Sequence, residues 1–204
     1  MTTAIWWIRR DLRLGDNQAL HAALVQSDVV FPVFILDPTL ESSSYTSQDR
    51  LAFLYAGLRS LDSDLRKCGS HLVIRRGDPL EVLHNLRADT SAQAIYAEAD
   101  ISPYARQRDA EVMRELPLKL APGVTIHPVE TVRKADGAPY TVFTPFSRMW
   151  QSLPIPGKPL PLPGKLSTPP PIDKALSETR VQADGSLRGS TSPIFMPRKT
   201  FRPG

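Results

Sequence analysis

The sequence predicts an α/β fold, a doubly wound sheet of five parallel strands. Short runs that are apolar almost throughout alternate with segments of helical periodicity. Strands that are apolar on both faces are typical of a parallel sheet covered by helices on both sides. The chain of 204 residues has room for one such domain and an appended segment. A ligand of such a sheet is expected beyond the carboxyl ends of its strands, where the strand order reverses.

Five segments are expected to form the strands, because each is a short β-rich run bounded by polar or turn residues. In chain order they are Ala4–Ile8, Val29–Leu36, His71–Arg75, Ala94–Ala97 and Val124–His127.

Helices are expected between these strands, because each gap opens with a capping signal. Asp16 can cap the first helix, and Thr46 with Asp49 resembles a capping box for the second. Asp78 and Ser102 are each followed by a proline, which is typical of the first turn of a helix. The apolar face of the second helix is expected to consist of Leu51, Leu54, Leu58, Leu61 and Leu65.

The composition changes after Leu153. Eleven of the 20 prolines fall within the last 51 residues, which show no helical period. Proline without periodicity is typical of extended, weakly packed chain. We therefore expect residues 1–153 to form the α/β domain and residues 154–204 to form a proline-rich linker or tail of irregular structure.

The net charge of +4 is unevenly distributed. Residues 1–153 carry 17 basic and 18 acidic side chains, whereas residues 154–204 carry 8 and 3. A domain without a basic surplus lacks the charge that neutralises several phosphates. We therefore do not expect this chain alone to bind DNA.

The sequence lacks the motifs that are typical of several classes of protein. The single Cys68 excludes an intrachain disulfide, and no histidine pair has metal-ligand spacing, so no metal is expected. The glycine-rich nucleotide loops and the nucleophile motifs of hydrolases are absent. No apolar run approaches the length of a signal peptide core or a membrane span, so a cytoplasmic protein with no membrane partner is expected.

Five segments together resemble the DNA photolyase/cryptochrome family. The first, WWIRRDLRLGDN at 6–17, is similar to the opening signature of that family, an aromatic strand followed by R-x-D-L-R and D-N. The others are FILDP at 34–38, RLAFL at 50–54, DISPYARQRD at 100–109 and YTVFTPFSRMW at 140–150. They occur in the family's order across most of residues 4–150, and residues beyond 153 resemble an interdomain connector.

The resemblance implies the N-terminal antenna domain of a deoxyribodipyrimidine photo-lyase, a flavoprotein that repairs cyclobutane pyrimidine dimers in damaged DNA by light-driven electron transfer from FAD. In that family the FAD and the lesion bind to a helical domain, which is expected to be absent here. We therefore expect a truncated or fragmentary photolyase that supplies the light-harvesting domain, holds no catalytic residue and is inactive alone, so whether it is itself an enzyme stays open. The alternatives are a stand-alone chromophore- or nucleotide-binding module and a fragment of a cryptochrome photoreceptor.

The candidate antenna site combines the resemblance with the expected topology. Polar residues that follow different strands should meet at one edge of the sheet, around a short apolar run. The candidate residues are Arg10, Phe34, Ile35, Leu36, Asp37, Arg50 and Asp100. The alternative is that Asp37 and Asp100 are strand-end caps and that the arginines pair with them on the surface.

The resemblance also suggests the chromophore. Family members with a folate antenna tend to show an Asn-Glu pair where this chain has Pro103 and Tyr104, whereas deazaflavin-type members resemble its Asp-Ile-x-Pro-Tyr pattern. We therefore expect 8-hydroxy-5-deazaflavin or another flavin, ahead of methenyltetrahydrofolate. Asp100 is expected to bond the polar edge of the ring and Arg50 to contact the ring or a phosphate.

Overall fold

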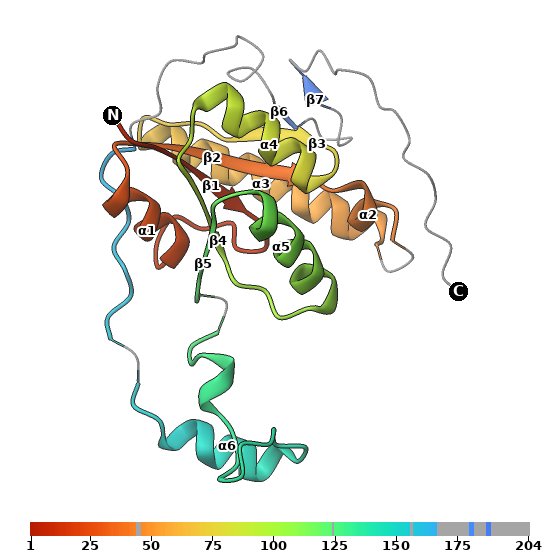
Figure 1. The fold of residues 1–204 in the computed structure, drawn as a ribbon, viewed down its shortest axis with the longest axis vertical. Helices are drawn as coiled ribbons and strands as arrows, with labels where there is room; N and C mark the ends of the chain where they lie inside the picture. The colour runs from red at the N-terminus through yellow and green to blue at the C-terminus, as the bar shows by residue number, and fades with distance from the viewer. Residues whose placement is uncertain (44–45, 124, 156, 167–179, 182–186, 189–204) are drawn as a thin grey trace.

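A five-stranded, all-parallel sheet forms the centre of the molecule, as the sequence predicts (Figure 1). The computed structural model describes residues 1–43, 46–123, 125–155, 157–166, 180–181 and 187–188. The strand order is β3-β2-β1-β4-β5. The chain thus winds outward from β1 to one edge of the sheet, then returns beside β1 and winds to the other edge. The order reverses between β1 and β4, and their carboxyl ends form the switch point.

The strands of this sheet are β1 (Thr3–Ile8), β2 (Val29–Leu36), β3 (Val73–Arg76), β4 (Ala94–Glu98) and β5 (Leu118–Ala121). The helices are α1 (Gln18–Gln26), α2 (Pro38–Glu41), α3 (Gln48–Lys67), α4 (Pro79–Thr90), α5 (Pro103–Glu115) and α6 (Phe143–Ser152), with a 3₁₀ turn, η1, at Val129–Thr131. A separate antiparallel pair joins β6 (Arg180–Val181) to β7 (Leu187–Arg188).

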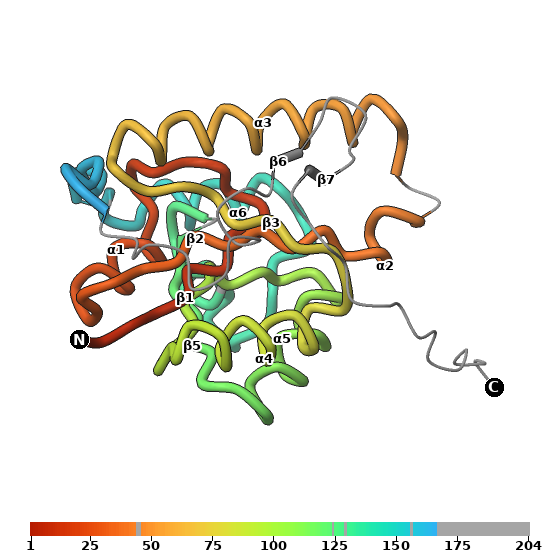
Figure 2. The backbone as a smooth tube through the Cα atoms, turned by 90° about the horizontal axis from the view of Figure 1, so that it is seen from above, coloured from red at the N-terminus to blue at the C-terminus, as the bar shows by residue number. Residues whose placement is uncertain are grey.

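Helices cover both faces of the sheet and divide the core into two layers. Figure 2 shows α3 on one side of the strands and α4 and α5 on the other. Alternate residues of β1 supply both layers, with Trp6 packed among α1 and α3 residues and Trp7 among α4 and α5 residues. Both tryptophans are buried. The predicted leucine face of α3 is confirmed, since Leu58, Leu61 and Leu65 are buried and Leu51 and Leu54 pack against the same layer.

The position expected for the fifth strand is wrong. The strand is β5 (Leu118–Ala121), and residues 125–127 form bends; Val124 lies outside the described residues. Pro117 and Pro122 bound the true strand, and its short edge position leaves Lys119 and Leu120 exposed. The apolar run that guided the expectation is therefore not the paired one.

The capping residues of two helices lie one position later in the sequence than predicted. Asn17, not Asp16, caps α1, and its Oδ1 accepts a hydrogen bond from the Leu20 N–H at 2.8 Å. Ser47, not Thr46, caps α3. The two starts marked by proline are confirmed, with Asp78 capping α4 and Ser102 capping α5. Proline fixes the register of a helix start, whereas neighbouring polar residues compete for the cap.

After β5 the chain leaves the sheet domain and then returns to it. Figure 1 shows α6 at the far end of this excursion, and none of its residues is buried. The returning residues 157–166, here called the return segment, contact the domain at two places. The Asp16 N–H donates to the Leu160 carbonyl oxygen at 2.9 Å, and the Leu166 N–H donates to the Cys68 carbonyl oxygen at 2.8 Å.

The expectation of a weakly packed tail is wrong for the return segment. Leu166 is only 1% exposed and belongs to the core layer beneath α1 and α3. Proline-rich sequence lacks periodicity, but an extended chain can still insert one apolar side chain and bond through its backbone.

Among the described residues, every helix is too short or too polar to pass through a lipid bilayer.

Candidate functional site

A narrow cleft opens at the switch point, between the carboxyl ends of β1 and β4. About 290 Å³ of space lies within and in front of it, most of it open to solvent, and the cleft itself holds about one water molecule. Residues 6–11 line it together with Asn17, Glu98 and Asp100. Its inner walls are the ends of two apolar strands, and its mouth carries the charged residues of the turns that follow them. This is where open α/β sheets bind ligands.

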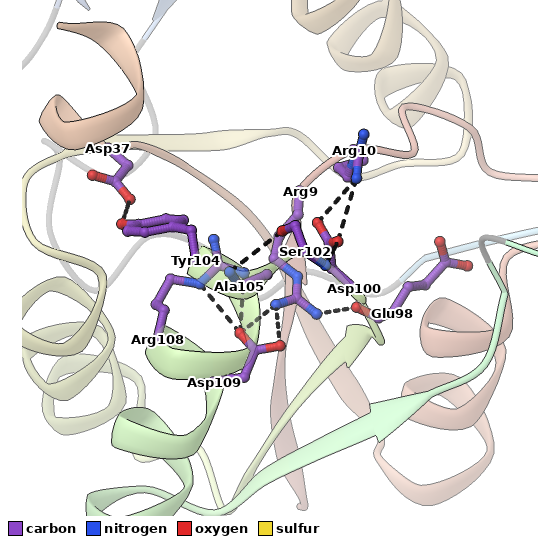
Figure 3. A network of polar contacts seen from close by, with 10 residues as sticks. All are labelled: Arg9, Arg10, Asp37, Glu98, Asp100, Ser102, Tyr104, Ala105, Arg108 and Asp109. Atoms are coloured by element: carbon purple, nitrogen blue, oxygen red, sulfur yellow. Dashed lines mark hydrogen bonds and ion pairs between the residues drawn. The ribbon is translucent and has the colours of Figure 1, made fainter. Parts of the chain in front are cut away.

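A buried ion pair holds the two strand ends together. The side chains of Arg9 and Asp109 are 8% and 5% exposed, and the Arg9 Nη1 lies 2.6 Å from the Asp109 Oδ1 (Figure 3). The Arg9 Nη2 also donates to the backbone oxygen of Glu98. Arg9 thereby links β1, β4 and α5. Burial lowers the pKa of the Arg9 guanidinium, while the carboxylate of Asp109 acts in the opposite direction.

Trp7 supports this pair from beneath. The guanidinium carbons of Arg9 and Arg108 lie 4.8 and 4.7 Å from the Trp7 ring centroid. Arg108 also donates to Asp109 at 3.0 Å. Cation–π contacts and charged hydrogen bonds at buried positions are among the stronger polar contacts in proteins. The floor of the cleft on this side is therefore rigid.

The structure brings Arg10 and Asp100 together, as the sequence predicts. The Arg10 Nη1 lies 3.3 Å from both carboxylate oxygens of Asp100. The Arg10 side chain is 63% exposed and that of Asp100 is 11% exposed. Burial raises the pKa of Asp100, but the hydrogen bond from the Ser102 N–H and the charge of Arg10 outweigh it and hold the pKa below its ordinary value.

Asp37 lies at the end of β2 and acts as a structural cap. Its Oδ1 accepts from the Thr39 N–H at 2.9 Å, and its Oδ2 accepts from the Tyr104 hydroxyl (Figure 3). Burial and the Asp37 carboxylate both raise the pKa of Tyr104. Asp37 thus joins β2 to α5 and does not line the cleft.

The remaining candidates are not gathered at the cleft. Phe34 and Leu36 are buried in the layer beneath α1 and α3, and Ile35 is buried in the opposite layer. Arg50 lies in the first turn of α3, as expected, and is exposed. Successive β2 residues point to opposite faces, so this apolar run contributes to the core rather than to a ligand surface.

Sequence reasoning missed Glu98, the last residue of β4. Glu98 is 8% exposed, and neither of its carboxyl oxygens makes a hydrogen bond of normal geometry within the described chain. Figure 3 shows its side chain pointing away from Arg9. The available signal was a single charged residue ending a strand that is otherwise apolar or aromatic, AIYAE at 94–98.

Glu98 holds a proton more tightly than an ordinary glutamate does. Burial raises its pKa, and the neighbouring Asp11 carboxylate raises it further, to about 7. The charge of Arg13 and the backbone N–H of Gln18 act in the opposite direction. Burial also raises the pKa of Asp11, against the charge of Arg13, whose Nε lies 2.9 Å from the Asp11 Oδ2. At neutral pH Glu98 is therefore about half protonated, and the pair carries less negative charge than two free carboxylates would.

Comparison with known proteins identifies the family. The family model described as DNA photolyase matches residues 4–164. This chain belongs to the DNA photolyase family. The match includes all five strands, the cleft and most of the return segment.

Individual photolyases agree with this assignment. The chain is 35% identical over 157 residues to a deoxyribodipyrimidine photo-lyase of Synechococcus. The aligned residues cover 74% of this chain and 32% of that protein. A class III photolyase of Agrobacterium tumefaciens superposes with a TM-score of 0.76 at 29% identity, over 82% of this chain and 35% of that one. A photolyase of Sulfolobus tokodaii superposes with a TM-score of 0.69 at 28% identity, over 82% of this chain and 39% of that one. That protein was solved with two FAD molecules, and its structure is described as implying a novel light-harvesting cofactor.

The chain corresponds to the N-terminal part of these photolyases and spans only a fraction of their length. Across the curated relatives compared, that share runs from 18% to 61%. Within the described residues, no group of three His, Cys, Asp or Glu side chains is arranged to hold a metal ion.

Proposed function

We propose that this chain is the light-harvesting domain of a photolyase-type protein and binds 8-hydroxy-5-deazaflavin, or another flavin, in the cleft between β1 and β4. The observation that carries the proposal is the convergence of Arg10 and Asp100 at the switch point of the sheet. This pairing places one cation and one anion at the mouth of a cleft with apolar walls, the usual composition of a site for a small organic ligand.

The residues at the cleft fit a flat heteroaromatic ring with polar edges. Trp6, Trp7 and Ile8 form its apolar walls, and Asp100 supplies a carboxylate near its mouth. The cleft itself has room for about one water molecule, so it can hold only an edge of a ring. A tricyclic ring would therefore extend past the strand ends toward the exposed Arg10.

The protein's part in this function is to bind and orient the ring. Ser102 holds Asp100 through a backbone N–H at 2.9 Å, so the carboxylate keeps one direction. Arg10, which is largely exposed, can turn toward a carbonyl or phosphate oxygen of a ligand without leaving its partner unpaired. When bound, the chromophore would absorb light and pass the excitation to a catalytic flavin.

We propose that light-driven repair of pyrimidine dimers depends on a second, FAD-binding domain and that residues 1–153 alone bind neither FAD nor damaged DNA. The near balance of 17 basic and 18 acidic side chains in these residues supports this, because DNA binding depends on a surplus of cations at the interface.

Titration of the full chain with 8-hydroxy-5-deazaflavin, followed by ring fluorescence, tests the proposal. Asp100→Ala removes a charged hydrogen-bond acceptor and should weaken binding about tenfold to a hundredfold. Arg50→Ala should weaken binding less, because Arg50 is exposed and lies away from the cleft. The matched control is Asp89→Ala, an exposed aspartate on α4, which should bind as the wild type does.

Equal affinities of the wild type and Asp100→Ala would overturn the assignment of the cleft. Binding of methenyltetrahydrofolate but not of the deazaflavin would overturn the assignment of the chromophore. Circular dichroism of each variant separates a lost contact from a lost fold.

A further inference from the structure

The turn between β1 and α1, residues 9–17, forms part of the cleft wall and also contacts the return segment. Arg10, Asp11 and Asn17 of this β1–α1 turn line the cleft. The turn contains neither helix nor strand, so the backbone hydrogen bonds of regular structure do not hold it in place. Its position therefore depends on the side chains and segments that it contacts.

The inner side of the β1–α1 turn is fixed by the core. Leu14 is buried, and Leu12 packs against the layer beneath α1 and α3. The fit against α3 is close, because a Cβ built on Gly57 would lie 2.7 Å from the Leu12 Cδ1. The outer side carries the charged groups, and the side chains of Arg10 and Arg13 are 63% and 46% exposed. Polar contacts therefore decide the position of the outer side.

Asp16 joins this outer side to the return segment through a pair of hydrogen bonds. Its N–H donates to the Leu160 carbonyl oxygen at 2.9 Å, and its Oδ1 accepts from the Leu160 N–H at 3.1 Å. Asp16 has a φ of 52°, in the left-handed region that glycine, asparagine and aspartate tolerate best. A Cβ built on the neighbouring Gly15 would lie 3.4 Å from the Leu162 Cδ2, so the two segments lie close together.

Arg13 connects Asp16 to the cleft. The Arg13 Nη2 donates to the backbone oxygen of Asp16 at 3.0 Å, and the Arg13 Nε lies 2.9 Å from the Asp11 Oδ2. The Asn17 Nδ2 donates to the Arg13 carbonyl oxygen at 3.3 Å. Asp11 and Asn17 both line the cleft. A continuous series of hydrogen bonds and ion pairs thus runs from the return segment to the cleft wall.

We propose that Asp16 couples the return segment to the antenna cleft, so that docking of the segment and binding of the chromophore strengthen each other. The docked segment holds the β1–α1 turn in the position that presents Arg10 to a ring at the mouth of the cleft. Asp16 acts through this turn and does not touch the ring, so it is a positioning residue. This inference rests on the proposed function, because it requires that the cleft bind a chromophore.

Coupling between two sites is reciprocal, and this gives the proposal a direct readout. If the docked segment tightens chromophore binding by a given factor, the bound chromophore makes release of the segment less favourable by the same factor. Hydrogen exchange of the Leu160 amide measures this release, because that amide donates to Asp16. A residue that merely supports the fold gives no such local response to the ligand.

Hydrogen exchange of the full chain, followed amide by amide by NMR with and without saturating 8-hydroxy-5-deazaflavin, tests the coupling without any substitution. The Leu160 amide should exchange about threefold to tenfold more slowly in the bound protein. The matched control is the Ala138 amide, which donates to the Asp136 Oδ1 at 2.9 Å in the excursion after β5, away from the cleft. Its exchange rate should be the same with and without the ligand.

Two substitutions separate the hydrogen bond from the backbone conformation. Asp16→Gly keeps the left-handed conformation without strain but removes the acceptor, and it should weaken deazaflavin binding about threefold to tenfold. Asp16→Asn keeps an acceptor oxygen and tolerates the same φ, so its affinity should stay within about twofold of the wild type. Asp136→Gly removes the same kind of contact from the excursion and should bind as the wild type does. Circular dichroism verifies the fold of each variant.

The two proposals fail in different ways. Wild-type protein that binds no deazaflavin overturns the proposed function, and with it the coupling. If the wild type binds and Asp100→Ala loses affinity, the proposed function stands. The coupling alone is then overturned by a Leu160 exchange rate that the ligand leaves unchanged, or by equal affinities of the wild type and Asp16→Gly. Equal losses in Asp16→Gly and Asp16→Asn also overturn it, because they assign the effect to the carboxylate charge.

Discussion

Arg9 and its carboxylate partner are the residues on which the geometry of the cleft depends most directly. Both are almost fully buried, and Arg108 shares the same carboxylate. Removing one partner of such a pair leaves an uncompensated charge, which costs more than the pair itself contributes.

Asp109→Ala should lower the free energy of unfolding by about 3–5 kcal/mol, because two guanidinium groups would lose their anion beneath the cleft. Urea denaturation measures this loss. The control, Asp64→Ala, breaks an exposed ion pair, in which the Lys67 and Asp64 side chains are 72% and 50% exposed. It should lower the free energy of unfolding by less than about 1 kcal/mol. Similar losses for the two variants would show that the Arg9 pair is not buried in solution.

At the scale of elements, the starts of the helices were predictable where proline fixes them. Asp78 accepts hydrogen bonds from the N–H groups of Leu80 and Glu81, at 3.0 and 3.1 Å, with Pro79 at the first helical position. Both donors lack a partner inside the helix, so the cap satisfies them.

Asp78→Ala should lower the free energy of unfolding by about 1 kcal/mol, the usual effect of losing a cap. Thermal denaturation followed by circular dichroism detects this as a lower melting temperature. Asp89→Ala, in the last turn of the same helix, removes a carboxylate from the end where negative charge is unfavourable. Its melting temperature should be unchanged or slightly higher, and an equal decrease in both variants would argue against the cap as the cause.

The site was predictable in part, for a physical reason. Parallel strands place their carboxyl ends on one edge, so residues that follow different strands, such as Arg10 and Asp100, could be expected to meet. Whether a side chain at a strand end faces a cleft or the core depends on the exact register. This is why Phe34 and Leu36 proved to be core residues and why Glu98 was not recognised.

At the scale of the whole molecule, the doubly wound sheet follows from strands that are apolar on both faces. The return segment does not follow from its sequence, because one leucine among prolines carries no periodic signal. Its contacts are nevertheless specific: the Leu160 N–H donates to the Asp16 side chain at 3.1 Å, and the Leu166 side chain lies in the core.

Leu166→Ala should lower the free energy of unfolding by about 2–4 kcal/mol, the range for removing a buried leucine side chain. Leu162→Ala is the matched control in the same segment, since Leu162 is 69% exposed, and it should change stability by less than about 0.5 kcal/mol. Equal stability of the two variants in urea denaturation would show that the return segment does not pack on the domain in solution.

The excursion through α6 shows where the chain of this domain can be altered. Because the chain leaves after β5 and comes back at residues 157–166, the packed domain consists of two pieces joined by a peripheral loop (Figure 1). The entropy of closing such a loop grows only with the logarithm of its length. Residues 125–155 are therefore a place where a foreign sequence can be grafted, or the chain cut and the two fragments recombined, while the sheet and its cleft stay intact.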